Sequence, residues 1–526
     1  MKLYRAFATV GGLTLLSRVL GFMRDIALAA VIGTGPVAEA FVVAFRFPNL
    51  FRRWFGEGAF NAAFVPLYAK RLEGEGREAA RAFASQALAG LGFILLIITI
   101  AAMIAMPWAM YALAPGFAQT PDKFDLAISM SRIAFPYLLC MSLVALLSGM
   151  LNSVGRFAES ASISVVLNLT LMAALGIAIA LGYGNDWRTG IVLAWGVFAA
   201  GLLQLAVLVL GAWHAGILPR LVRPVWSEDM RRLVTLGIPG VVAGGATQIN
   251  IVIGGIIASL QEHAVGWLYF ADRLYELPLA IIGIAIGVVL LPDVSRHLRA
   301  GNHAAVMDSQ NRALELSMLL TVPAAMAFAV IPGPIVSVLF ERGKFSLADT
   351  HAVAGALAIF AVGLPSFVMQ KVFQPGYFAR EDTRTPMRYT AWSLGVNTLG
   401  AIGLFFLFPR LGLSSHLGIA VATSVGGWLN AVLLYRGLVR RGHFEADARL
   451  KWALPMILLS SAVMALVLIA GTYQLAPRLA VGQPLVVRGG ALAVLIMVGA
   501  VVYFATAFAT GAIRPAQIGR IWRRRA

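Results

Sequence analysis

Charge is scarce in this 526-residue sequence, and acidic charge is scarcer than basic charge. Only 13% of the residues are charged, whereas 60% are apolar even before the 53 glycines are counted. A soluble protein of this length needs a more polar surface, so the composition excludes a cytosolic enzyme. The 42 Lys and Arg residues outnumber the 24 Asp and Glu residues, and the resulting net charge of +18 needs an explanation.

Residues that carry chemistry are also scarce. Cys140 is the only cysteine, which excludes a disulfide framework and a thiolate metal site. The seven histidines show no metal-ligand spacing, and the sequence contains no P-loop, GxSxG or kinase motif. We therefore expect neither an enzyme nor an ATP-driven pump.

Long apolar runs, by contrast, fill the chain from end to end. A helix needs about 20 mostly apolar residues to cross a membrane, and no polar gap between the runs is long enough for a soluble domain. The sequence therefore predicts an all-α integral membrane protein with 14 transmembrane helices. The predicted spans are residues 7–32, 37–66, 86–113, 127–151, 159–182, 189–213, 230–259, 265–292, 313–339, 351–370, 387–408, 416–437, 452–474 and 485–508.

The loops between these spans differ in basic charge. By our count, the termini and the loops on their side of the membrane hold 28 Lys and Arg residues, and the opposite loops hold 7. This bias is typical of the positive-inside rule and predicts that both termini are cytoplasmic. Because the basic residues are spread loop by loop rather than gathered in one patch, nucleic acid is not an expected partner.

Two stretches of the chain resemble each other. Residues 38–66 and 264–292 each contain Ala-x-Arg, followed by a proline 20 or 19 residues after the arginine. Six spans separate the copies, so both run in the same direction, which suggests parallel six-helix repeats. We therefore expect an N-terminal lobe over 1–215, a C-terminal lobe over 216–440, and two further helices with a basic tail over 441–526.

Seven basic residues fall at membrane depth, and all of them are arginine. Each charge at a span centre costs ~2.5–3.5 kcal/mol, so such side chains normally face a cavity and pair with, or bind, something. Guanidinium stays charged and directs two donors onto phosphate, which favours a pyrophosphate head group, whereas a cavity for cationic drugs would need an acidic surplus. The arginines are Arg18, Arg24, Arg46, Arg52, Arg53, Arg132 and Arg273, and the acidic residues at this depth are Asp25, Glu39, Glu57, Asp272 and Glu276.

Two of these spans contain residues that can bend a helix. Gly21 lies between Arg18 and Arg24, and a bend or unwinding there would turn both arginines into one space. In the second span, Pro48 should kink the helix just before Arg52.

Four segments carry a family resemblance that covers essentially the whole chain. They read LLSRVLGFMRDIALAAVIG, FRFPNLFRRWFGEGAFNAAFVP, YFADRLYELPLAIIGIAIGVVLLP and QPGYFAREDTRTP. These segments resemble the MurJ (MviN) family of lipid II flippases, within the multidrug, oligosaccharidyl-lipid and polysaccharide exporter superfamily. The resemblance implies two pseudo-symmetric six-helix lobes around a cavity and two extra helices. It also implies alternating-access transport of undecaprenyl-pyrophosphate-linked peptidoglycan precursor across the bacterial inner membrane.

The resemblance also implies which residues bind the substrate. The family's essential cavity arginines fall on Arg18, Arg24, Arg52 and Arg273, which are expected to hold the pyrophosphate. Glu39 stands where relatives usually carry aspartate. The supporting cavity or gate residues, expected from the resemblance or from the charge pattern, are Ser17, Asp25, Glu39, Arg53, Glu57, Asp272 and Glu276.

Some family members bind a sodium ion in spans 7, 11 and 12. The corresponding spans here offer Asn250, Asn397 and Thr423 without a carboxylate, so these residues are only weak candidates for a sodium site. We expect no cofactor, and transport driven by the membrane potential or an ion gradient. The expected partners are lipid II, bilayer lipids and the cell-wall synthesis and division machinery. An exporter of another lipid-linked oligosaccharide, such as an O-antigen or capsule unit, stays open as an alternative, whereas the cationic surplus disfavours a multidrug antiporter.

Overall fold

A computed structural model describes residues 2–52, 60–225, 227–235 and 252–513 of the chain. Within these ranges every regular element is a helix, which confirms the predicted all-α fold class. The helices form two compact units. Unit 1 consists of Met1–Gly266 and Arg342–Phe345, and unit 2 consists of Trp267–Glu341 and Ser346–Ala526. The predicted lobe boundaries at 215/216 and 440/441 stay a prediction.

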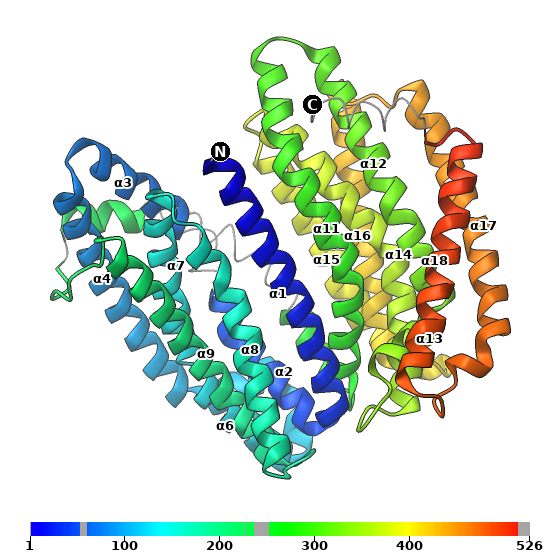
Figure 1. The fold of residues 1–526 in the computed structure, drawn as a ribbon, viewed down its shortest axis with the longest axis horizontal. Coiled ribbons are helices and arrows are strands. Elements are labelled where there is room, and N and C mark those ends of the chain that lie inside the picture. The colour runs from blue at the N-terminus through cyan, green and yellow to red at the C-terminus, as the bar shows by residue number, and fades with distance from the viewer. Residues whose placement is uncertain (1, 53–59, 226, 236–251, 514–526) are drawn as a thin grey trace. The chain divides into compact units, whose positions relative to one another are not determined.

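Unit 1 is a bundle of long helices in which α1 packs against α8, α8 and α7 pack against α9, and α2 packs against α6 (Figure 1). Small residues allow the close approach of α8 and α9, since a Cβ on Gly196 would lie 2.7 Å from the Cβ of Ala174. The helices of this unit are α1 (Lys2–Ile32), α2 (Pro36–Arg52), α3 (Phe60–Gly74), α4 (Arg77–Ile104), α5 (Met106–Leu113), the 3-10 helix η2 (Pro115–Gln119), α6 (Pro121–Ala134), α7 (Tyr137–Ser153), α8 (Ala158–Ala180) and α9 (Trp187–His214).

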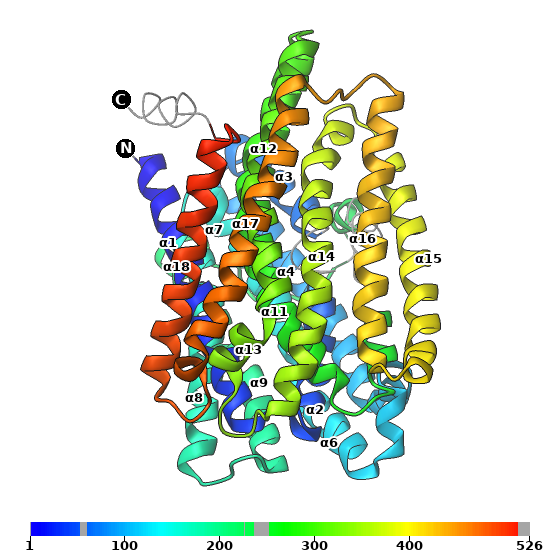
Figure 2. The same ribbon diagram turned by 90° about the vertical axis from the view of Figure 1, so that its right-hand side faces the viewer.

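Unit 2 is a second bundle, in which α16 packs against both α14 and α15, and α12 packs against α14 and α17. The last two helices, α17 and α18, lie side by side (Figure 2). Gly363 brings α14 close to α16, because a Cβ there would lie 2.7 Å from Ser424 Oγ. The helices are α11 (Ala264–Arg299, whose first three residues belong to unit 1), α12 (His303–Val330), α13 (Pro332–Phe340), α14 (Leu347–Phe378), α15 (Arg384–Leu407), the 3-10 helix η3 (Phe408–Leu411), α16 (Ser415–Arg440), α17 (Ala448–Leu479) and α18 (Leu485–Ala509).

Ten helical segments within the described ranges are long and apolar enough to cross a membrane. Helices α1 and α11 are also long, at 31 and 36 residues, but they carry charged side chains away from their ends and are not among the ten. The predicted span at 230–259 falls mostly outside the described residues. The chain is therefore a multi-pass membrane protein, and the number of 14 spans stays a prediction.

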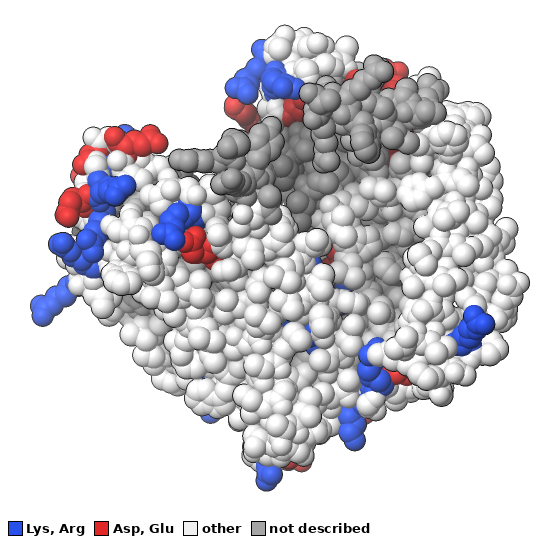
Figure 3. Space-filling model, viewed as in Figure 1, with Lys and Arg blue, Asp and Glu red and all other residues white. Residues whose placement is uncertain are grey.

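Charged side chains are distributed unevenly over the surface of unit 1. Figure 3 shows them gathered at the end of the unit where α3 lies, above a broad and almost uncharged surface. The uncharged surface suits contact with the hydrocarbon tails of lipids, and the charged end of the unit suits the aqueous interface.

Helix α1 differs from the expectation drawn from Gly21. It runs unbroken from Lys2 to Ile32, so the chain does not unwind at Gly21. Gly21 instead permits a close neighbour, because a Cβ at this position would lie 3.3 Å from Asn168 Nδ2 of α8. The glycine therefore serves helix packing here, and Arg18 and Arg24 keep the separate directions that a regular helix gives them.

Candidate functional site

A polar cluster joins the middle of α1 to α8 inside unit 1. Arg24 is 7% exposed, and its Nη2 donates to Asp25 Oδ1 at 2.8 Å. Its Nη1 donates to Asn168 Oδ1 at 2.9 Å. The same Asn168 uses its Nδ2 to donate to the Ser17 carbonyl oxygen at 2.9 Å. Three predicted site residues, Ser17, Arg24 and Asp25, therefore lie in one hydrogen-bonded cluster.

The cluster holds Arg24 as a paired cation. A charge buried to this degree is stable in a low-dielectric setting only when it is paired and hydrogen-bonded, and both Asp25 and Asn168 meet that need. Arg24 therefore differs from an open anion receptor, because an incoming anion must compete with the carboxylate of Asp25.

Arg18 lies on the same helix in a different setting. Its side chain is exposed, and within the described part of the chain no residue forms an ion pair or hydrogen bond with it. It is six residues from Arg24, or about 9 Å along the helix axis. Among the predicted arginines whose side chains the structure describes, Arg18 is thus the one whose five donors stand open to a ligand.

Arg273 occupies α11 in unit 2, together with two predicted acidic residues. Its Nη1 donates to Glu276 Oε2 at 3.2 Å, and the guanidinium carbon lies 4.9 Å from the ring centroid of Tyr269. The Arg273 and Glu276 side chains remain 38% and 43% exposed, and Asp272 is half-buried. A partly exposed ion pair of this kind is weak, so an anion can exchange with Glu276 at modest cost.

Glu39 does not lie with the arginines of α1. It is 1% exposed and forms a buried ion pair with Lys123 of α6. Its other oxygen, Oε1, accepts a hydrogen bond of 3.1 Å from the Val265 backbone N–H at the start of α11. The Lys123 ammonium also lies 3.9 Å from the Phe117 ring centroid. Glu39 therefore joins α2, α6 and the start of α11.

Several predicted site residues fall where the side chains are not described. Arg52 is the last residue of α2, and nothing is described of its side chain. Arg53, Glu57 and Asn250 lie outside the described residues altogether.

The weak sodium-site candidates do not gather into a charged site in the described ranges. Asn397 of α15 is 8% exposed, and the Thr423 hydroxyl donates to the Ile419 carbonyl oxygen within its own helix. The described residues contain no group of three or more His, Cys, Asp or Glu side chains that could hold a metal ion. A sodium ion here would have to rely on neutral oxygen ligands.

Arg132 shows what a structural arginine looks like at this depth. It is exposed at the end of α6, and its Nε donates to the Met103 carbonyl oxygen of α4 at 3.0 Å. The bond satisfies one of the free carbonyls at the end of α4. An arginine near a span end can therefore stabilise the packing of two helices without binding a ligand.

Two partners of the predicted residues were missed in the sequence. Asn168 is an amide in the middle of a long apolar run, and a lone amide at a span centre is the signal that could have identified it. Lys123 was counted as a loop charge, because it falls between the predicted spans 86–113 and 127–151. Its burial against Glu39 depends on a contact between residues 84 positions apart, which no local pattern encodes.

Comparison with known proteins gives consistent results. The family model described as "Lipid II flippase MurJ" matches residues 28–487. The chain is 46% identical over 526 residues to a "Probable lipid II flippase MurJ" of Rhizobium tropici, covering 100% of this chain and 97% of the relative. It is 47% identical over 522 residues to the protein of that name in Rhizobium meliloti (strain 1021), covering 99% and 96%. A "Lipid II flippase MurJ" of Burkholderia cenocepacia is 34% identical over 454 residues, 85% of each chain.

Solved structures agree on the fold. A structure titled "Lipid II flippase MurJ, inward closed conformation" aligns with a TM-score of 0.75 at 22% identity, covering 95% of this chain and 97% of that one. An inward-facing multidrug resistance MATE family transporter of the MOP superfamily aligns with a TM-score of 0.66 at 14% identity, covering 82% and 97%. Together with the full-length relatives, the family model leads to one conclusion: this chain belongs to the MurJ family of lipid II flippases.

Proposed function

We propose that this protein is a lipid II flippase, which moves the undecaprenyl-pyrophosphate-linked peptidoglycan precursor from the cytoplasmic to the outer leaflet. The observation that carries this proposal is the 46% identity to a relative of that name over all 526 residues. The names of the relatives favour lipid II over other lipid-linked oligosaccharides such as O-antigen or capsule units.

The chemistry of the arginines supports recognition of the pyrophosphate. Arg18 presents a guanidinium with no partner among the described residues, and such a fork binds a phosphate through two parallel hydrogen bonds. Arg24 follows six residues later, already oriented by Asp25 and Asn168. In the proposed order of binding, the pyrophosphate reaches Arg18 first. It then competes with the Asp25 carboxylate for Arg24. The proposal assigns Arg273 and Arg52 the same role.

Orientation and driving force complete the proposal. The excess of basic residues in alternate loops supports cytoplasmic termini and an inner-membrane location. The net charge of the head group and its arginines responds to the membrane potential, at ~2.3 kcal/mol per charge per 100 mV. The proposal therefore needs no ATP and no cofactor, and it extends to contacts with the cell-wall synthesis and division machinery.

The test compares two arginines at membrane depth in a strain depleted of the native protein. Arg18→Ala should abolish growth, because the open guanidinium is lost. Arg132→Ala removes an equal charge from an exposed arginine that contacts only a helix end, and it should support growth. Both variants must reach the membrane at equal abundance. Normal growth with Arg18→Ala would remove Arg18 from the site.

A direct measurement separates this function from its alternative. Newly made lipid II should lose its accessibility to an outer-leaflet probe when the protein is depleted, and the full-length chain should restore it. If accessibility stays unchanged while another lipid-linked oligosaccharide disappears from the outer leaflet, the alternative exporter is correct.

A further inference from the structure

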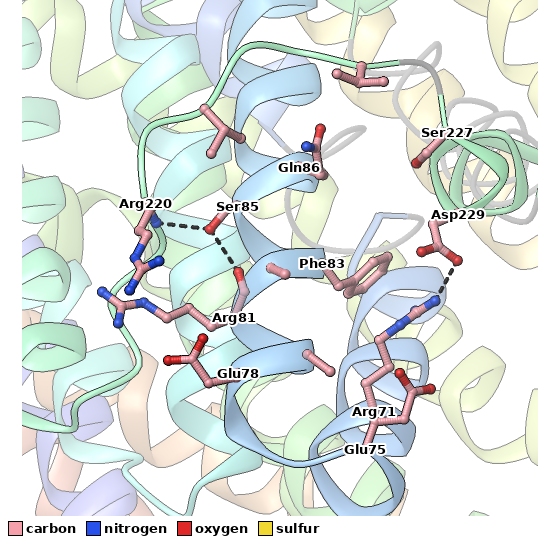
Figure 4. Close-up of a pocket in the computed structure, with 14 residues that line it drawn as sticks. Arg71, Glu75, Glu78, Arg81, Phe83, Ser85, Gln86, Arg220, Ser227 and Asp229 are labelled. Atoms are coloured by element: carbon pink, nitrogen blue, oxygen red, sulfur yellow. Dashed lines mark hydrogen bonds and ion pairs between the residues drawn. The ribbon is translucent and has the colours of Figure 1, made fainter.

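Unit 1 contains a polar cavity that none of the predicted transport residues lines. Its volume is about 510 Å³, and it lies between the end of α3, the first turns of α4 and residues 220–225 and 227–229, which follow α9 (Figure 4). It therefore belongs to the charged end of unit 1. The polar residues of its wall are Arg71, Glu75, Glu78, Arg81, Ser85, Gln86, Arg220, Ser227 and Asp229.

Hydrogen bonds fix the segment after α9 to α4. The Arg220 backbone N–H donates to Ser85 Oγ at 2.9 Å, and Ser85 Oγ donates to the Arg81 carbonyl oxygen at 2.7 Å. Arg81 Nε donates to the Leu218 carbonyl oxygen at 2.7 Å. The wall of the cavity is thus preorganised, because its loop side and its helix side are joined at two places.

The arginines on the two sides of the cavity differ in whether their guanidinium groups already have partners. Arg71 forms an ion pair with Asp229 and lies 4.4 Å from the centroid of Phe83, so it is already engaged. The terminal nitrogens of Arg81 and the whole guanidinium of Arg220 have no partner among the described residues. Figure 4 shows these two groups pointing toward each other. Two facing cations repel, and an anion between them removes the repulsion.

A carboxylate in the same wall limits the charge of the anion. Glu78 lies beside Arg81 in Figure 4 without forming an ion pair with it. Arg81, Arg220 and Glu78 carry a charge of +1 between them, and the whole wall is neutral once Arg71, Glu75 and Asp229 are added. This balance matches a phosphodiester monoanion better than a phosphate dianion. Gln86 Oε1, also in the wall, is buried without a donor among the described residues. It suits a ligand that carries a hydroxyl group.

The loop side of the cavity also presents apolar side chains. Leu221 is 92% exposed, and Val222 and Val225, which line the cavity, are 38% and 56% exposed. Exposed apolar residues beside arginines at the charged end of a membrane bundle are typical of the lipid interface, where the tails and the phosphates meet.

We propose that this cavity binds the phosphodiester head group of a membrane phospholipid between Arg81 and Arg220, with the apolar loop residues against its acyl chains. The site would hold a structural or modulating lipid, separate from the transported substrate. A free phosphate ester shares the charge chemistry but not the acyl contacts, so the two sources can be told apart.

The test uses the purified full-length protein and native mass spectrometry. Phosphatidylglycerol is titrated against the parent chain, Arg81→Gln/Arg220→Gln and Arg223→Gln/Arg232→Gln. The last variant removes two exposed arginines from the same region outside the cavity wall. The first variant should weaken lipid binding about tenfold or more, and the control should change it less than about twofold. Equal weakening by both double variants would reduce the effect to general surface charge and overturn the proposal.

Two further arms identify the ligand. Diacylglycerol, which has the same tails without the phosphodiester, should not bind, and binding equal to that of phosphatidylglycerol would overturn the role of the arginines. sn-Glycerol 3-phosphate at millimolar concentration should not displace the lipid, and complete displacement would make the site one for soluble phosphate esters.

Arg220→Gln alone guards against misfolding, because the Arg220 side chain forms no contact that the fold needs. If this folded variant binds the lipid like the parent, the proposal is wrong.

Discussion

The buried pair of Glu39 and Lys123 allows a sharp test of whether a charge at membrane depth is structural. Both side chains are nearly inaccessible, at 1% and 6% exposed. Lys123→Met keeps the apolar stem and removes the charge, which leaves a buried carboxylate without its cation. Breaking a buried pair in this way costs about 3–5 kcal/mol. The hydrogen bond from the Val265 N–H to Glu39 is retained in this variant and offsets only a small part of that cost.

Removing the negative partner instead should lower the free energy of unfolding by less. Glu39→Gln keeps an acceptor for Val265, and the Lys123 ammonium keeps its contact with the Phe117 ring, a type of contact worth about 0.5–2 kcal/mol. Replacing both partners, in Glu39→Gln/Lys123→Met, should recover most of the loss, because no unpaired charge remains. The order of unfolding temperatures is therefore expected to be parent, double variant, Glu39→Gln, Lys123→Met.

Thermal unfolding in detergent, followed by tryptophan fluorescence, measures this order, and a double-mutant cycle gives the coupling. Additive losses in the double variant would refute the reasoning, because they would mean that the two charges do not interact. Transport supplies the second readout. If the double variant has parent-like stability but does not support growth, then Glu39 acts in transport and is not only structural.

Two other predictions follow from the contacts of the described residues. Asn168→Leu removes the amide that joins Arg24 to the Ser17 carbonyl. It should therefore lower the unfolding free energy by about 1–3 kcal/mol and weaken the packing of α1 against α8. Hydrogen exchange of the α1 amides measures this effect, and an unchanged exchange rate would contradict the prediction. Burial raises the pKa of Asp382, but hydrogen bonds from Thr385 and Arg441 outweigh it and lower this pKa to about 2. Because the unfolded value is about 3.9, the stabilisation is complete above about pH 5 and is lost as the pH falls through 2. Asp382→Asn should therefore destabilise by about 1–2 kcal/mol at pH 7 and by almost nothing at about pH 1, and a pH-independent difference would contradict the ion pair with Arg441.

Much of the fold could be predicted from the sequence because membrane helices are encoded locally. A run such as 189–213 is apolar throughout, and its helix, α9, covers Trp187–His214. The structure breaks other runs where local chemistry demands it. The predicted span 313–339 is divided between α12 and α13 at Ile331, just before Pro332, since proline favours the first turn of a new helix.

The site was only partly predictable, because sequence identifies a buried charge but not its partner. Arg18 and Arg24 look alike in sequence, yet Arg24 is paired with Asp25 and Asn168, and Arg18 is exposed. The difference arises from α8, whose Asn168 lies against Gly21 and accepts a hydrogen bond from Arg24 but not from Arg18. Packing between distant segments therefore decides which arginine is held by the protein and which is left for a ligand.

In the proposed function, the pairing of Arg24 with Asp25 affects how a pyrophosphate would be held and released. A site made only of open arginines would bind a polyanion tightly and release it slowly. A site in which one arginine has its own carboxylate offers a competing partner, so that departure of the anion is followed by the return of Asp25 to Arg24. The free energy of that internal ion pair offsets part of the binding energy, as a carrier requires, because its ligand must leave as readily as it arrives.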